Sequence, residues 1–121
     1  MSNYTELRVW EKAHDLALGV YQVSTNLPKI ETYGLQAQMR RAAVSIPSNL
    51  AEGAGRSTHR DFARFVSIAV GSANELDYQL LLTRDLGYAD AVVIDDLRWR
   101  VAEVRRMLSA LRKSLVSTDD N

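Results

Sequence analysis

The chain has 121 residues, which is enough for one domain with a buried core, and 46% of them are apolar while 25% are charged. It contains no cysteine, which excludes disulfides, zinc–thiolate sites and thiol catalysis. Fifteen basic and fifteen acidic residues cancel, whereas proteins that depend on nucleic-acid backbones usually carry excess positive charge.

Residues 8–27 carry the first helical pattern. Their apolar residues step alternately by three and four positions, a period typical of helices that pack nearly parallel with a left-handed twist. Pro28 disfavours helical geometry in the residue before it, so we expect this helix to end at Leu27. The residues predicted to enter the core are Val9, Ala13, Leu16, Val20, Val23 and Leu27.

A second helix is expected over residues 32–54, although Pro47 lies inside it. Proline removes one backbone hydrogen bond and can kink or divide a helix. We favour a kinked helix because the apolar phase continues across the proline. Gly53 and Gly55 can each take the left-handed conformation that stops a helix. The predicted core face is Leu35, Met39, Ala42, Ile46 and Leu50.

Two further helices, over residues 58–87 and 90–116, keep the same alternating rhythm. Thr58 begins a capping-box pattern, Gly87 should end the third helix, and Asp90 suits the N-cap of the fourth. The predicted core residues are Phe62, Val66, Ala69, Ala73, Leu76, Leu80 and Thr83, followed by Ile94, Leu97, Val101, Val104, Leu108, Leu111 and Leu115.

Together these patterns predict one all-α domain, an antiparallel up-down-up-down four-helix bundle. The apolar period favours bundle packing over orthogonal crossings, and the short connections favour antiparallel neighbours. Residues 117–121 are polar and acidic, and we expect them to fray.

The helix over residues 32–54 has a second apolar stripe, which is unusual in a monomer. Small or apolar residues recur every seven positions opposite its core face, with a narrow polar stripe between the two faces. We therefore expect a homo-oligomer with this helix at its interface. The alternative is that alanine is simply a good helix former that covers little surface. The predicted interface residues are Ala37, Arg41, Val44, Ser45, Asn49, Ala51 and Glu52.

Polar side chains close to the core should be paired, because an unpaired buried charge is costly. A partly buried Glu75 would need a partner such as Arg40 or Arg41, and we favour a structural ion pair there over acid–base work. Within an oligomer interface, the expected pairs are Arg41 with Glu52, or Gln38 with Ser45 and Asn49.

Two arginine-rich regions are candidate contacts for phosphate or nucleic acid. One is a glycine-rich junction before a helix N-terminus, which attracts anions, although a helix stop followed by a cap explains the same residues. The other is residues 98–113, with six basic residues against one acid. This run can contact nucleic acid, form a solvated face, or be neutralised by the acidic 75–96 region of a neighbouring copy. The candidate contacts are Arg56, Arg60, Arg98, Arg105 and Arg106.

The sequence shows no catalytic or metal-binding constellation. His14 and His59 lie on different predicted helices, and neither has further ligands at a suitable spacing, so we interpret both as surface histidines. Ser45 and Ser72 have no histidine at a spacing compatible with nucleophilic catalysis. We therefore expect no enzymatic activity, no metal and no cofactor.

Residues 31–53 read ETYGLQAQMRRAAVSIPSNLAEG, and an opening segment at residues 7–13 reads LRVWEKA. With Phe62, Phe65, Ala69, Ser72, Glu75 and Leu76, these segments resemble the bacterial four-helix bundle family, which includes proteins encoded in intervening sequences of large-subunit ribosomal RNA genes. The resemblance implies a homopentameric ring of bundles without established enzymatic activity. It also implies a distant similarity to the accessory variability protein of diversity-generating retroelements, which binds nucleic acid and a reverse transcriptase. That relative is strongly basic, whereas this chain is neutral.

These patterns favour a non-enzymatic, homo-oligomeric scaffold that recruits a protein or nucleic-acid partner, and the resemblance implies that the oligomer is ring-shaped. The alternative is a nucleic-acid-binding protein that uses its arginine-rich surfaces. The first residues lack the basic-then-apolar pattern of a secretory signal, and no apolar run approaches the ~20 residues of a membrane span. We therefore expect a cytoplasmic protein that has no membrane partner.

Overall fold

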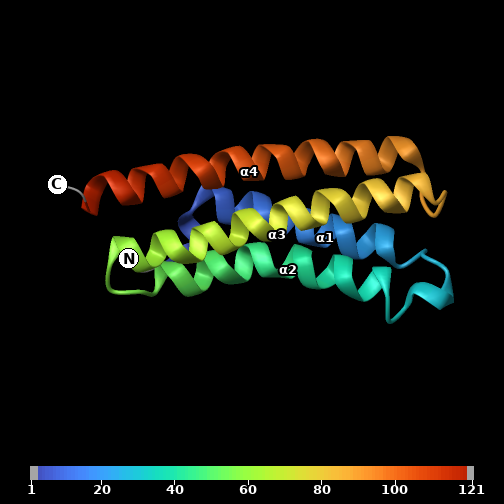
Figure 1. The fold of residues 1–121 in the computed structure, drawn as a ribbon, viewed down its shortest axis with the longest axis horizontal. Coiled ribbons are helices and arrows are strands. Elements are labelled where there is room, and N and C mark those ends of the chain that lie inside the picture. The colour runs from blue at the N-terminus through green and yellow to red at the C-terminus, as the bar shows by residue number, and fades with distance from the viewer. Residues whose placement is uncertain (1–2, 120–121) are drawn as a thin grey trace.

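Four long helices form the structure. A computed structural model describes the backbone of residues 3–119 and the side chains of residues 3–117. Successive helices run antiparallel and each packs against its neighbours in chain order, and α1 also packs against α4 (Figure 1). The elements are η1 (Tyr4–Glu6), α1 (Arg8–Ser24), η2 (Lys29–Glu31), α2 (Leu35–Ala54), α3 (His59–Asp85) and α4 (Ala91–Asp119), with no strand between residues 3 and 119.

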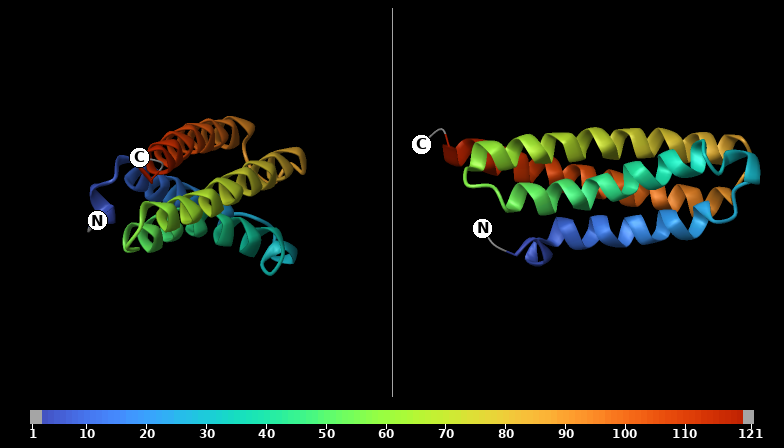
Figure 2. Two further views of the ribbon diagram at one scale, coloured as in Figure 1. Left: turned by 60° about the vertical axis from the view of Figure 1, so that its left-hand side comes forward. Right: turned by 90° about the horizontal axis from the view of Figure 1, so that it is seen from below.

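The α1–α2 pair and the α3–α4 pair form opposite sides of the bundle (Figure 2). The backbones of helices at opposite corners of the bundle do not approach each other closely within the described chain, and the α1–α4 contact is the least extensive of the four. A partner bound between α1 and α2 would therefore leave the outer face of α3 and α4 uncovered.

The predicted core faces are confirmed. Every residue predicted to be buried on α2 and α3 is buried, and on the other two helices only Val23 and Leu111 are half-buried. The alternating three–four spacing therefore identified the contacts that hold the bundle together. The largest fully buried side chains come from all four helices and include Phe62, Leu16, Met39, Ile46, Leu50, Leu76, Leu80, Ile94 and Leu108.

Helix α1 ends at Ser24, three residues before the predicted end, because side chains of α2 bind its last carbonyl groups. Gln36 Nε2 donates to the Ser24 carbonyl at 2.7 Å, and Arg40 Nε donates to Ser24 Oγ at 2.9 Å. The Arg40 guanidinium also lies 4.6 Å from the centre of the Tyr21 ring. A cation at a helix C-terminus satisfies free carbonyls and complements the helix dipole. Arg40 therefore binds the end of α1 and does not form the suggested ion pair with Glu75.

The other helix ends follow local signals. Thr58 Oγ1 accepts from the Asp61 N–H at 3.0 Å, and Asp90 Oδ1 accepts from the Val92 N–H at 2.7 Å, which confirms both predicted N-caps. Gly87, with φ +74°, follows α3 as predicted. Helix α2 runs without a break through Pro47.

Helix α4 extends beyond its predicted end at residue 116, while the expected fraying of residues 117–121 stays a prediction. Helix α4 continues to Asp119, because no glycine or proline interrupts it and Leu115 still packs in the core. Residues 120 and 121 lie outside the described part of the chain.

The prediction that Gly53 stops α2 is wrong, because Gly53 is a helical residue buried against α3. A Cβ atom at this position would lie 2.7 Å from Phe62 Cδ1 and 2.9 Å from Phe65 Cβ. Gly55 follows the helix with φ −85°, so it does not take the left-handed conformation either. Glycine is thus required at position 53, but the reason is the close packing of α2 against α3 and not the end of the helix.

Glu31 joins the two connections at one end of the bundle. Its Oε1 accepts from the Leu35 N–H at 3.1 Å, which caps α2, and its Oε2 accepts from the Tyr88 hydroxyl at 3.1 Å. The hydrogen bond to Glu31, followed by partial burial, raises the pKa of the Tyr88 phenol above its ordinary value.

We expect Tyr88 to ionise at higher pH than an ordinary tyrosine, and Glu31→Gln to lower its pKa. Because the folded-state pKa is raised, the stabilisation is present below the unfolded value near 10 and is lost as pH rises through the folded value. Ultraviolet difference titration measures this late transition. Tyr88→Phe should remove it, whereas Tyr33→Phe, at a side chain that is 96% exposed, should not. A late transition that survives Tyr88→Phe would contradict the assignment.

Candidate functional site

The side of the bundle formed by α1 and α2 has an apolar groove. Its cavity volume is about 400 Å³, and several of its side chains are exposed, among them Leu18 at 58%, Tyr21 at 43% and Val44 at 40%. The apolar groove is lined by Tyr4, Trp10, His14, Ala17, Leu18, Tyr21, Val44, Pro47, Ser48 and Ala51.

Aromatic contacts close one end of the apolar groove. The Trp10 ring packs edge-on against Tyr4 of η1 with 5.1 Å between ring centres, and stacks on His14 with 5.0 Å between centres and 6° between planes. Turn η1 itself is held by Asn3, whose side chain accepts from the Thr5 N–H at 3.1 Å. This end of the groove is therefore built from sequence-local contacts on α1 and the turn before it.

The second apolar stripe on α2 consists of Ala37, Val44 and Ala51. These small side chains determine how open the apolar groove is. Val44 and Ala51 line it, while Ala37 lies further along the same stripe and is half-buried. Small side chains at this spacing leave room for another chain to approach closely. The structure thus brings two of the three stripe residues to one concave surface, together with apolar residues of α1.

The remaining predicted interface residues of α2 lie on its other edge. Ser45 Oγ is 2.8 Å from Ser72 Oγ of α3, and Asn49 Nδ2 donates to the Ser45 carbonyl and hydroxyl at 2.8 and 3.0 Å. These half-buried groups satisfy one another within one chain. The expected pairing of Gln38 with Ser45 and Asn49 is not formed within the chain, because Gln38 is exposed and Ser45 and Asn49 bind each other and Ser72 of α3.

The other expected ion pairs are not formed within the chain. Glu52 lies 3.9 Å from Arg56, one helical turn away, and not against Arg41. Arg41 is exposed and has no bonded partner among residues 3–117. Glu75 is exposed, so the expectation that it is partly buried is wrong. It lies on the outer side of α3 because the core positions of that turn are taken by apolar side chains.

On the opposite side of the bundle, α4 places three arginines seven residues apart along its contact with α3. We call Arg98, Arg105 and Arg112, with their α3 partners, the arginine seam. Arg98 donates to both Asp77 oxygens at 2.9 and 3.2 Å, and this hydrogen bonding raises the pKa of Arg98 against the opposing effect of partial burial. The charge of Arg98 is thereby neutralised within the chain.

The other two arginines of the seam have neutral partners. Arg105 Nη1 donates to Asn74 Oδ1 at 3.1 Å, and Arg112 Nε donates to Ser67 Oγ at 2.6 Å. An amide or a hydroxyl positions a guanidinium without cancelling its charge. The positive charges of Arg105 and Arg112, which lie nearer the start of α3, are therefore uncompensated.

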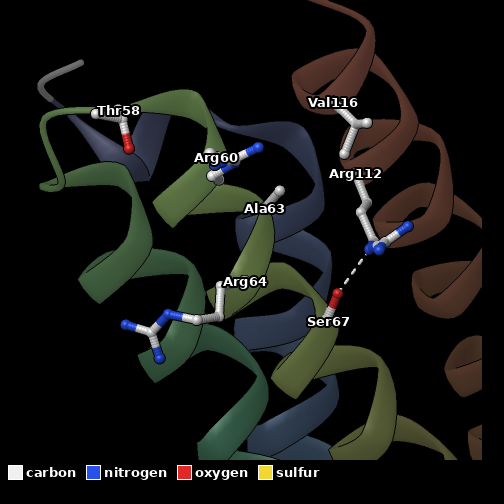
Figure 3. Close-up of a pocket in the computed structure, with 7 residues that line it drawn as sticks. All are labelled: Thr58, Arg60, Ala63, Arg64, Ser67, Arg112 and Val116. Carbon is white, nitrogen blue, oxygen red and sulfur yellow. Dashed lines mark hydrogen bonds between the residues drawn. The ribbon is translucent and has the colours of Figure 1, made fainter. Parts of the chain in front are cut away.

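An open groove of about 680 Å³ continues the seam at that end of the bundle (Figure 3). Arg60 and Arg112 both project into it from facing helices, whereas Arg64 turns away towards the Phe65 ring, 4.5 Å from its centre. Arg60 has no bonded partner among residues 3–117. The basic groove is lined by Thr58, Arg60, Ala63, Arg64, Ser67, Arg112 and Val116.

The predicted phosphate contacts thus occupy different environments. Arg56 is engaged within the chain, since it lies 3.7 Å from Asp61 and its guanidinium stacks 4.7 Å from the centre of the Phe65 ring. Arg106 is exposed beside the seam and has no bonded partner among residues 3–117. Arg112 belongs to the basic run 98–113 but was not among the named candidate contacts, although its position seven residues after Arg105 was an available signal.

Potential metal ligands do not gather within the described part of the chain. His14 and His59 are exposed on different helices, as predicted, and no cluster of three or more potential ligands occurs within residues 3–117. Across the same part of the chain, no helix combines the length and apolar character that crossing a membrane requires.

Residues 5–110 match the family described as 23S rRNA-intervening sequence protein. The chain belongs to this family. The match includes α1, α2 and α3 in full and most of α4, and it confirms the resemblance found in residues 31–53. No curated protein matches this chain.

Among solved structures, the fold resembles a protein with unknown function from the S23 ribosomal protein family of Bacteroides thetaiotaomicron VPI-5482. The TM-score is 0.80, the sequences are 23% identical, and the similarity covers 87% of this chain and 95% of the other. At this identity the likeness establishes the helical fold alone. The family and the solved structure indicate no catalytic activity and leave the function open.

Proposed function

We propose that this protein is a non-enzymatic, homo-oligomeric scaffold whose subunits join through the apolar groove between α1 and α2. The observation that carries the proposal is the exposure of Leu18, Tyr21 and Val44 in one concave surface. Soluble monomers rarely leave a contiguous apolar patch uncovered, and covering it with a second copy removes these side chains from water.

The concave shape of the apolar groove supports a ring over a two-fold dimer. In a two-fold contact the same surface would face itself, so two grooves would enclose an unfilled space. A groove is better filled by a different, convex surface of a neighbour, and such a head-to-tail contact forms a ring when the rotation between neighbours closes. The pentamer implied by the family resemblance is one such ring. In this proposal the convex surface lies outside the outer face of α3 and α4, and that face recruits a protein or nucleic-acid partner.

We expect sedimentation velocity between about 1 and 100 µM to show a concentration-dependent oligomer for the natural sequence. Leu18→Arg combined with Val44→Arg should reduce it to a monomer, because two charges would be buried without partners. Both side chains are exposed in the single chain, so the bundle itself should keep its helical circular dichroism signal and melting temperature.

Val92→Arg is the matched control, since Val92 of α4 is 77% exposed and lies outside the apolar groove. This variant should assemble like the natural sequence. A natural chain that stays monomeric throughout the concentration range would overturn the scaffold proposal. An oligomer unaffected by Leu18→Arg with Val44→Arg would exclude this groove as the interface.

A further inference from the structure

The two ends of the α3–α4 side carry opposite charge although the whole chain is neutral. Residues 74–96, at the end where α3 stops and α4 starts, contain six acids and one base. At the other end, residues 104–117 of α4 contain four basic residues and no acid. Opposite charges at the two ends allow an anion to bind locally to a protein whose net charge is zero.

Three uncompensated arginines follow one line at the basic end. Arg105 and Arg112 have neutral partners on α3, and Arg60 projects into the basic groove without a bonded partner among residues 3–117. Arg60 lies seven residues before Ser67, the partner of Arg112, so it continues the same spacing along α3. Seven helical residues rise about 10 Å, and the three charges therefore extend over roughly 20 Å.

This length selects the class of anion. A single phosphate is too small to contact charges separated by about 10 Å, whereas a polyphosphate chain presents negative charge continuously along such a distance. The guanidinium groups keep free N–H donors after binding their neutral partners, and these donors suit phosphate oxygens. The surface is therefore suited to an extended polyanion.

The lining of the seam distinguishes nucleic acid from protein. The basic groove and the smaller hollow that continues it at Val70 and Ser109 are lined by arginine, serine, threonine, alanine and valine side chains and include no aromatic residue. Protein partners usually gain affinity from buried aromatic or large apolar anchors, and single-stranded nucleic acids from stacking on aromatic rings. A duplex backbone needs neither, because charge supplies most of its binding energy.

We propose that Arg60, Arg105 and Arg112 along the α3–α4 seam bind the phosphodiester backbone of duplex nucleic acid. Arg98 is excluded from this site because Asp77 neutralises it, and Arg56 because it is held by Glu52, Asp61 and Phe65. The site lies on the opposite side of the bundle from the apolar groove, so a chain bound in that groove does not cover it.

Fluorescence anisotropy with labelled duplexes of about 20 base pairs, one of RNA and one of DNA, tests the proposal. Three phosphate contacts predict a log–log salt slope of about −2.7, which weakens binding about 40-fold between roughly 50 and 200 mM salt. Each single substitution, Arg60→Gln, Arg105→Gln or Arg112→Gln, should reduce the slope by about one. If the protein binds only one of the two duplexes, that result identifies the ligand as RNA or as DNA.

Two controls distinguish binding at this site from non-specific attraction of nucleic acid to basic residues. Asp77→Asn with Arg98→Gln removes an arginine of the same seam without changing net charge, and it should leave the salt slope unaltered. Arg8→Gln with Lys29→Gln removes the same charge as Arg105→Gln with Arg112→Gln but from exposed positions elsewhere, and it should have the smaller effect.

Three results would overturn the proposal. These are the absence of duplex binding at low salt, binding that persists in the triple variant Arg60→Gln, Arg105→Gln and Arg112→Gln, and equal losses in the two charge-matched double variants. Preferential binding of a polyglutamate probe would instead assign the seam to an acidic protein. Because the seam side chains are exposed or half-buried, each variant should keep the helical circular dichroism signal of the natural chain.

Discussion

Replacing Phe62 by alanine should lower the free energy of unfolding by about 3–5 kcal/mol, the typical cost of emptying a buried aromatic site. Phe62 is 2% exposed and belongs to the single core cluster that unites the four helices. Because domains of this size are stable by roughly 5–15 kcal/mol, one substitution would remove a large part of the total. Urea unfolding followed by circular dichroism, at one fixed protein concentration, measures the change.

Tyr78→Ala is the matched control for that experiment. Tyr78 is an aromatic residue of the same helix but is 60% exposed, so its removal should change the free energy of unfolding by about 0.5 kcal/mol or less. Equal losses in Phe62→Ala and Tyr78→Ala would contradict the assignment of Phe62 to the core.

The second large effect is expected at Gly53, where alanine should destabilise the bundle by about 1–3 kcal/mol. The added methyl group would overlap the Phe62 ring and Phe65 Cβ, and the latter moves only with the α3 backbone. Gly71 provides the opposite case, because it is also helical but has no atom within 4 Å of the position a Cβ would take. Gly71→Ala should therefore stabilise the protein by about 0.5–1 kcal/mol, since alanine is the better helix former.

The same unfolding experiment compares the two glycines, and a third variant identifies the cause. In the Gly53→Ala background, Phe62→Leu removes the ring that the new methyl group meets. Phe62→Leu should therefore lower the free energy of unfolding less in this background than in the natural chain. If the two substitutions are additive, or if Gly53→Ala is as favourable as Gly71→Ala, the close contact between α2 and α3 is not the reason for Gly53.

Much of the fold could be predicted from sequence because its signals are local. The alternating apolar period places residues on one side of a helix whatever the partner is, and caps such as Thr58 and Asp90 act within one turn. The end of α1 could not be predicted in this way. It depends on Gln36 and Arg40, which reach Ser24 from the next helix.

The candidate sites were predicted less completely, for the same reason. The second stripe of α2 correctly indicated an unusual surface at Val44 and Ala51, but the residues that complete the apolar groove come from α1 and η1. The basic run on α4 was visible as composition, whereas the partner of each arginine was not. Arg98 and Arg105 differ only in whether the facing turn of α3 offers an aspartate or an asparagine.

The sequence by itself determined the four helices, their core faces and their antiparallel order, because helical periodicity and short connections constrain each segment independently of the others. Only the tertiary structure decided which charges are cancelled, why Gly53 must lack a side chain, and that Arg60 and Arg112 face one groove. These features depend on the register between neighbouring helices, which is determined by the packing of side chains across the whole interface.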